Sequence, residues 1–171
     1  MKTIFSILAL TALVAGCQVA PGSYTVVRVA SADTVRSPSC YNNNVPDDIV
    51  NDSTTFYAGG TLGIFAADAD NYFVDITTNN GPLTVDGTRD GGDYSFYGKA
   101  VDYEADVDGM GGARTTTYEA DIRFTLKTHT VIGTAEFTTT CTGVNCGVDS
   151  CVETTDFIGT VVRDVELEHG I

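Results

Sequence analysis

The chain has 171 residues, of which 23 are acidic and 9 are basic, so its formal net charge is −14 at pH 7. A charge of this sign argues against a nucleic-acid-binding protein, because phosphate contacts need basic side chains, and against direct adsorption to anionic lipid head groups. Apolar residues make up 43% of the chain, which is typical of a folded protein and not of a disordered one.

Residues 4–15 form an apolar run broken only by Ser6 and Thr11, and Lys2 gives the run a positively charged start. This layout is typical of an export signal. The run is about a dozen residues long, which is short of the roughly 20 that a helix needs to cross a bilayer. No later apolar segment approaches that length, so we expect no membrane-spanning helix in the processed chain.

The end of this run, Leu13-Val14-Ala15-Gly16-Cys17, resembles the lipobox of bacterial lipoproteins. The resemblance implies cleavage before Cys17, acyl chains such as palmitate on that cysteine, and anchoring in a membrane. Gln18 in place of Asp after the cysteine implies sorting to the outer membrane. Residues 1–16 would then be a removed signal peptide, residues 17–23 the lipidated cysteine with a short tether, and residues 24–171 one domain. The alternative is an ordinary secretory signal, with Cys17 free or in a disulfide.

Four further cysteines are expected to form two disulfides in an exported chain: Cys40, Cys141, Cys146 and Cys151. A metal site is less well supported, because the gaps between the last three do not match the C-x-x-C spacing of zinc sites. Three connectivities are possible. If two strand ends face each other across the final loop, Cys141 pairs with Cys151 and Cys146 with Cys40. The main alternative pairs Cys40 with Cys141 and Cys146 with Cys151.

Short segments rich in β-branched and aromatic residues recur along the rest of the chain, separated by turn signals and without a helical interval. We expect strands at residues 24–30, 54–58, 61–66, 72–77, 83–86, 94–105, 118–126, 131–140 and 156–165. Residues 37–53 are expected to form a long polar loop. Because the connections are short, the sheet should be antiparallel.

Two patterns indicate how these strands are arranged. Apolar and polar residues alternate from Tyr118 to Leu126, as in a strand with one wet face. Other residues expected to face inward are Val101, Tyr103, Ala105 and Val107. The triplet Ile-Gly-Thr occurs around Gly133 and again around Gly159, and glycine inside a strand often marks a sharp bend. We therefore predict an all-β domain, a closed antiparallel barrel of about eight strands, with a two-layer sandwich as the alternative.

Few residues point to catalysis or to a metal. His129 is expected on the wet face of a strand, His169 lies near the end of the chain, and no nucleophile motif occurs. We therefore expect a non-catalytic protein without a cofactor. One acidic cluster resembles the first half of a Ca²⁺ loop but lacks the closing Glu, so it is expected to be solvated: Glu104, Asp106 and Asp108. A second acidic loop, also expected to be solvated, contains Asp86, Asp90 and Asp93.

Together these features predict an exported, lipid-anchored β domain that acts as an interaction or structural module at the cell envelope. The alternative function is that of a lipocalin-like carrier of a small apolar ligand. Such carriers usually have a G-x-W motif on the first strand, whereas this chain has no Trp. The residues expected to face inward on one strand, Tyr118, Phe124 and Leu126, are also large enough to fill a small barrel.

Overall fold

A computed structural model describes residues 19–41, 56–78, 81–107 and 109–163 of the chain. No helix in these ranges is long and apolar enough to cross a bilayer. One short 3₁₀ helix, η1 (Pro38–Tyr41), follows the first strand. The strands are β1 (Tyr24–Arg36), β2 (Thr61–Ala66), β3 (Tyr72–Thr78), β4 (Gly81–Asp90), β5 (Asp93–Glu104), β6 (Arg114–Leu126), β7 (Thr130–Gly143) and β8 (Ser150–Val162).

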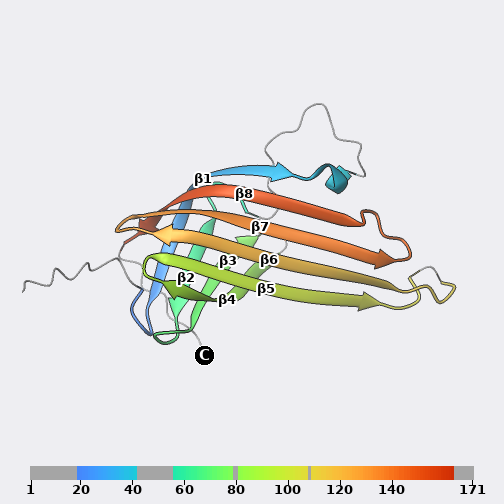
Figure 1. Cartoon of the computed structure of the whole chain (residues 1–171), viewed down its shortest axis with the longest axis horizontal. Coiled ribbons are helices and arrows are strands. Elements are labelled where there is room, and N and C mark those ends of the chain that lie inside the picture. Colours follow the sequence, from blue (N-terminus) through green and yellow to red (C-terminus); the bar gives the residue numbers. More distant parts are fainter. Residues whose placement is uncertain (1–18, 42–55, 79–80, 108, 164–171) are drawn as a thin grey trace, which may run out of the picture.

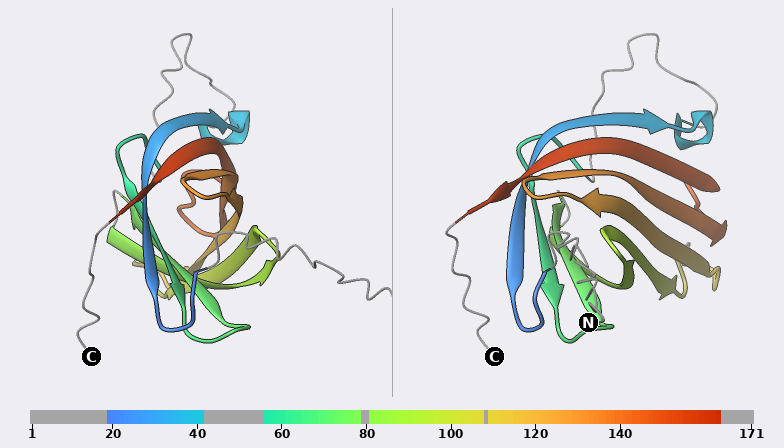
Figure 2. Two further views of the ribbon diagram at one scale, coloured as in Figure 1. Left: turned by 90° about the vertical axis from the view of Figure 1, so that its left-hand side faces the viewer. Right: turned by 60° about the vertical axis from the view of Figure 1, so that its left-hand side comes forward.

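The eight strands form a closed barrel in simple chain order. Each strand pairs antiparallel with the strands before and after it, and β1 closes the ring by pairing with β8. The left-hand view of Figure 2 looks into this ring. The predicted closed antiparallel barrel is therefore confirmed, and the sandwich alternative does not apply.

The strands differ in length, so the closed barrel occupies only one end of the molecule. β2 and β3 have six and seven residues, whereas β5 to β8 have 12 to 14. β4 pairs with β5 only from Gly87 to Asp90, and β2 pairs with β1 only as far as Arg28. Past these points β5, β6, β7, β8 and the second half of β1 continue as a curved five-stranded sheet, which extends away from the barrel in Figure 1.

The interior of the barrel is filled by inward-facing side chains. The rings of Tyr94 and Phe124 stack with centroids 5.2 Å apart, and those of Phe56 and Phe157 lie 4.7 Å apart. Each buried aliphatic or aromatic side chain contributes about 1.5–3 kcal/mol to folding. Aliphatic residues that surround the rings include Val27, Val29, Leu62, Ile64, Val74, Ile76, Ile122 and Val131.

Two glycines allow adjacent strands to approach closely around this core. A Cβ on Gly133 would collide with the carbonyl oxygen of Arg123 and with Phe124, and a Cβ on Gly159 would collide with Val27. Only glycine fits where one strand curls this tightly over the next. This agrees with the expectation that the two Ile-Gly-Thr triplets mark bends in the sheet.

The strand predicted at residues 54–58 is wrong in its described part. Residues 56–58 form a bend and a turn, and residues 54 and 55 lie outside the described ranges. Phe56 is buried against Phe157, and backbone hydrogen bonds join Val29 to Gly59 and Gly60. The apolar residue that suggested a strand is instead a single ring inserted into the core.

The acidic loop predicted around residues 86–93 is also wrong, because these residues continue two strands. Asp86 and Asp90 lie on β4, and Asp93 begins β5 directly opposite Asp90. All three face away from the core, and the outward positions of a strand accept polar side chains, so their polarity does not mark a loop.

β8 likewise begins at Ser150, six residues before the predicted start, because its polar first residues belong to the strand as well.

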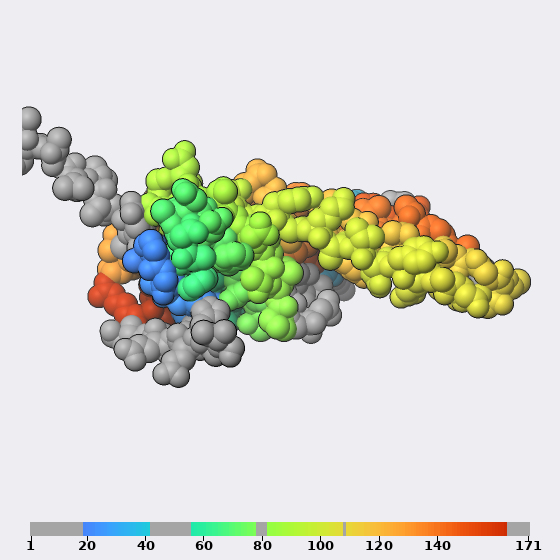
Figure 3. Space-filling view, turned by 90° about the horizontal axis from the view of Figure 1, so that it is seen from below, coloured from blue at the N-terminus to red at the C-terminus, as the bar shows by residue number. Residues whose placement is uncertain are grey.

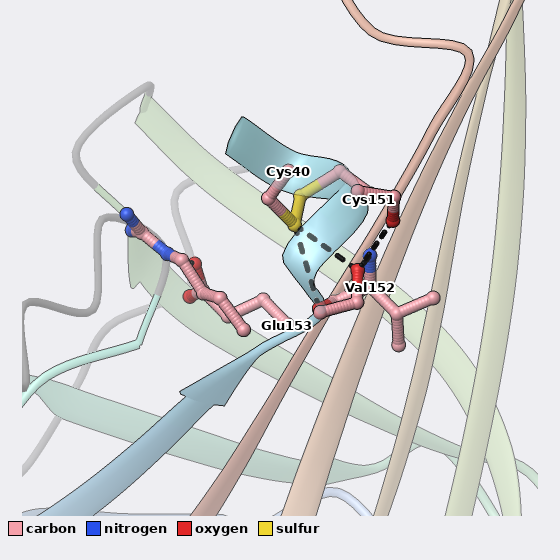
Figure 4. The surroundings of a disulfide bond; sticks show 7 residues. Cys40, Cys151, Val152 and Glu153 are labelled. Atoms are coloured by element: carbon pink, nitrogen blue, oxygen red, sulfur yellow. Dashed lines mark hydrogen bonds and ion pairs between the residues drawn. A yellow bond between two sulfur atoms is a disulfide. The ribbon is translucent and has the colours of Figure 1, made fainter. Parts of the chain in front are cut away.

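The four body cysteines form two disulfides as predicted, but both predicted pairings are wrong. The bonds join Cys40 to Cys151 and Cys141 to Cys146. Cys151 lies opposite Thr139 in the β7–β8 register, so it does not face Cys141. The chain after β1 instead passes beside β8, where the Ser37 N–H donates to the Val152 carbonyl at 2.9 Å, and this contact places Cys40 next to Cys151 (Figure 4). Two disulfides indicate a chain that folds in an oxidising, extracytoplasmic compartment.

The described part of the predicted tether is docked on the barrel. Val19 is 3% exposed, and its N–H donates to the Tyr94 hydroxyl at 3.5 Å. The Gly22 N–H donates to the Ala66 carbonyl at 2.7 Å. In Figure 3 the blue start of the described chain lies at the opposite end of the molecule from the yellow β5–β6 turn.

Candidate functional site

The most distinctive surface is a projecting part of the curved sheet, which we call the β5–β6 arm: residues 97–104 of β5, residues 114–120 of β6 and the turn between them. In Figure 3 the arm forms the narrow end of the molecule. Its two strands pair continuously from Gly98 opposite Ala120 to Glu104 opposite Arg114, and Tyr97 lies opposite Asp121, the next residue of β6. β6 also pairs with β7 along this length, from Arg114 opposite Gly143 to Ala120 opposite Phe137, so the curved sheet holds the arm extended.

Large apolar side chains are concentrated on the arm and exposed to solvent. Five of the nine exposed large hydrophobic residues among the described residues belong to it: Tyr97, Val101, Tyr103, Met110 and Tyr118, with exposed fractions from 49% to 88%. Scattered single hydrophobic residues are normal on a surface, but a concentration on one projecting element is typical of an interaction site.

The orientation predicted for several of these residues is wrong. Val101 and Tyr103 were expected to face inward, but they are 59% and 65% exposed on the outer face of β5. The buried residues Tyr94 and Phe96 fix the strand so that its even-numbered residues face inward. Tyr118 shares the face of the buried Ala120 and Ile122, but it lies past the closed barrel and is 49% exposed. Ala105 and Val107 follow β5 in the turn and belong to no strand.

Glu119 is the centre of a polar cluster on the outer face of the arm. Its Oε1 lies 2.8 Å from the Lys99 ammonium and accepts a hydrogen bond from the Tyr97 hydroxyl at 3.1 Å. The Lys99 contact, followed by the Tyr97 hydrogen bond, lowers the pKa of the Glu119 carboxyl. The same contacts with Glu119 raise the pKa of Tyr97 and of Lys99. The cluster therefore holds three side chains in one arrangement over the β5–β6 pair.

The described acidic residues at the end of the arm form contacts with neighbouring residues of the same chain. Glu104 forms an ion pair with Arg114, and Asp106 Oδ1 accepts the Gly111 N–H at 2.7 Å. Asp106 has a left-handed backbone with φ of 57°, which a tight turn requires. Asp108 lies outside the described residues. Among the described residues, no three His, Cys, Asp or Glu side chains are grouped so as to hold a metal ion.

A second polar group lies inside the sheet, near the Cys40–Cys151 disulfide. The Arg36 Nε lies 2.8 Å from Glu153 Oε2, and the hydroxyls of Thr34 and Thr155 are 2.9 Å apart. Burial lowers the pKa of Arg36, but hydrogen bonds to Glu153 and Tyr41 outweigh it and raise the pKa overall. No buried side-chain nitrogen or oxygen in the described residues lacks a hydrogen-bond partner. Such complete pairing is typical of a structural network and not of an open catalytic site.

Three depressions lie on the described surface. Two shallow ones, of about 360 and 440 Å³, share the segment Ile132–Thr134 on the outer face of β7. A third, of about 270 Å³, lies beside Val19 and is bordered by Tyr72 and Arg89. The His129 ring contacts Arg163, whose Nη2 lies 3.0 Å from Nδ1, and the His129 carbonyl accepts the Val161 N–H at 3.0 Å. His169 lies outside the described residues.

No protein-family model matches the chain, and it matches neither a curated protein nor a solved structure. The arm must therefore be interpreted from its own geometry. A signal for it was present in the sequence: the apolar residues are even-numbered at Tyr94 and Phe96, but odd-numbered from Tyr97 to Tyr103. A switch of this kind within one strand indicates that its apolar side chains leave the core and reach the surface.

Proposed function

We propose that this protein is an exported lipoprotein, acylated at Cys17 and held at the outer membrane, whose barrel displays the β5–β6 arm as a non-catalytic interaction surface. The observation that carries this proposal is the placement of two features at opposite ends of the molecule. The chain enters the barrel at one end, at the buried Val19, and the exposed apolar arm forms the other end (Figure 3).

The short connection between Cys17 and Val19 supports a fixed orientation at the membrane. Two residues span at most about 7 Å, and Val19 is packed into the barrel. Acyl chains on Cys17 would therefore hold the entry end of the barrel directly against the bilayer. The arm would point away from the membrane, where a partner can reach it.

The packed interior favours an interaction module over a lipocalin-like carrier. Such a carrier needs an open apolar cavity inside the barrel. In the described residues this space is occupied by aromatic rings, including those of Tyr94, Phe96, Phe124 and Phe157.

The anchor is tested by mass spectrometry of the mature protein and by fractionation of Cys17→Ser. We expect an N-terminal peptide that begins at Cys17 and carries acyl chains. We also expect the variant to move to the soluble fraction, because the barrel surface alone is too acidic to bind anionic lipid. A free thiol at Cys17, or a variant that remains in the membrane pellet, would contradict the proposal.

The orientation is tested with single tryptophans, since the chain contains none of its own. Ala69 borders the same depression as Val19, whereas Met110 is 88% exposed at the end of the arm. We expect brominated lipids to quench the fluorescence of Ala69→Trp and to leave that of Met110→Trp unchanged. Equal quenching at both positions would mean that the arm does not point away from the bilayer.

A further inference from the structure

The outer edge of β5 is an open strand edge in the described structure. β4 pairs with β5 only over Asp93–Phe96, so from Tyr97 to Glu104 the described hydrogen-bonded partner of β5 is β6 alone. Val85 of β4 still lies against the inner face of Gly98, and no β4 residue is paired with β5 beyond that point. Half of the backbone N–H and C=O groups of these eight residues therefore point away from the sheet. Such an edge is a template for pairing with another strand.

We propose that this edge pairs with the same edge of a second copy of the chain, in antiparallel fashion about a two-fold axis, so that two curved sheets join into one. The proposal rests on the arm being an interaction surface and does not depend on acylation of Cys17. It names the partner of the arm as a second copy of this protein.

The first argument is the placement of two tyrosines on the edge, which makes the edge complementary to itself. An isologous interface places the same patch of both copies in contact, so the patch must be complementary to itself. Tyr97 and Tyr103 lie three residues on either side of Ala100, and both are exposed on the outer face of β5. Reading the strand in reverse therefore exchanges one tyrosine for the other.

The second argument is that symmetry leaves few registers. Residues directly opposite in an antiparallel pair lie on the same face, so a two-fold axis must place one residue opposite its own copy. With Lys99 on the axis, two ammonium groups would face each other. With Val101 on the axis, Tyr97 would fall opposite a turn residue. With Ala100 on the axis, each Tyr97 lies opposite Tyr103 of the other copy and each Lys99 opposite Val101.

On the outer face of the Ala100 register, no two like charges lie opposite each other. The two Tyr97–Tyr103 pairs are aromatic cross-strand pairs, which stabilise antiparallel sheets. On the opposite face the axis carries only two alanine side chains. Gly98 lies opposite Asp102 there, and the Asp102 carboxylate must turn aside from Val85, which lies against Gly98. Lys99 remains bound to Glu119 of its own chain, at the solvent-exposed face.

The net charge of −14 limits this association. Two copies repel each other at low ionic strength, and salt screens this repulsion. We therefore expect dimerisation to strengthen between roughly 0.02 and 0.3 M NaCl, as the Debye length shortens. A dimer that weakened with salt would contradict an interface built on tyrosines and backbone hydrogen bonds.

The experiment is disulfide cross-linking of Ala100→Cys in the full-length chain, in isolated membranes and in detergent. In the proposed register the two introduced cysteines are opposite each other, with a Cα–Cα distance of about 4.5–5.5 Å, which a disulfide can bridge. We expect a covalent dimer after mild oxidation, with mass spectrometry locating the bond between the two copies of residue 100. Met110→Cys, which is more exposed but off the axis, controls for random collision and should give little dimer.

Two matched substitutions in the Ala100→Cys chain test the register. Val101→Lys places a second cation opposite Lys99 of the other copy, twice per dimer, and should reduce dimer formation roughly ten-fold. Val101→Glu places an anion there and should preserve or increase it. Val101 is exposed, so circular dichroism should show both variants folded. No dimer with Ala100→Cys, a cross-link to a protein of another mass, or equal effects of Lys and Glu would overturn the proposal. Membrane fractionation of the same samples reports separately on Cys17.

Discussion

At the scale of single residues, the least exposed charge in the described structure is Glu153, and its partner Arg36 sets its environment. The Glu153 side chain is 6% exposed and that of Arg36 is 20% exposed, with their charged atoms 2.8 Å apart. An ion pair removed from water adds little net stability, but removing one partner leaves the other charge unpaired. Sequence patterns did not predict this pair, because the contact depends on β1 returning beside β8.

We expect Glu153→Gln to lower the free energy of unfolding by about 2–3 kcal/mol, less than for a fully buried pair because Arg36 keeps some contact with water. The double variant Arg36→Met/Glu153→Leu should be clearly more stable than Glu153→Gln. Urea denaturation followed by circular dichroism measures both. If the double variant were the less stable of the two, the pair itself would be a net source of stability.

Gly133 provides a second test at this scale. Gly133→Ala should destabilise the protein by about 1–3 kcal/mol, because the added methyl group meets the Arg123 carbonyl and Phe124 with no free space. Gly147→Ala is the matched control, since no atom lies within 4 Å of a Cβ at that position. The midpoint of urea denaturation should fall for the first variant and stay unchanged for the second.

At the scale of elements, all eight strands were located from the sequence, with one additional strand wrongly predicted at residues 54–58, whereas the strand lengths and the disulfide pairing were not predicted. Turn signals and β-branched runs located every strand, because these depend on neighbouring residues. The extension of β8 back to Ser150 depends on pairing with β7, which no local pattern records. The projecting arm was missed for the same reason: inward and outward faces on β5 are set by Tyr94 and Phe96, many residues from its end.

The two disulfides should differ in their effect on stability, because they close loops of different length. Cys40–Cys151 spans 111 residues of sequence and Cys141–Cys146 spans 5. By loop-closure entropy, replacing the first pair by serine should cost about 5 kcal/mol and replacing the second about 2 kcal/mol. Thermal unfolding of the two double-serine variants measures this order. Equal losses would show that the longer loop is already constrained in the unfolded chain.

At the scale of the whole molecule, the excess of acidic side chains opposes folding of the compact barrel. Within the described residues, four cations form ion pairs: Arg36, Lys99, Arg114 and Arg123. The remaining carboxylates repel one another over distances of about 30 Å at 0.01 M salt but only about 8 Å at 0.15 M. The melting temperature should therefore rise with salt over this range, and equally with sodium or choline chloride. An increase with sodium alone would indicate a specific ion site instead of screening.

The closed barrel was predictable because eight short-linked antiparallel strands must protect the two edges of their sheet, and glycines within the strands allow the sheet to curl until those edges pair. The proposed partner of the arm was not predictable. It depends on the open edge of β5, which exists because β5 continues to Glu104 while its pairing with β4 ends at Phe96. The resemblance of residues 13–17 to a lipobox, in contrast, depends only on neighbouring residues and needs no fold to be recognised.

The seam between β1 and β8 has a consequence for how the protein reaches its compartment. The ring is completed by the first and last strands, so a polypeptide that is translocated N-terminus first cannot finish its barrel until nearly all of it has crossed. Until then one edge of β1 lacks its partner β8, and Cys40 cannot form its disulfide with Cys151. On the proposed export route, arrival of the C-terminal strand would therefore be the last step, which closes the ring and brings the two distant thiols together for oxidation.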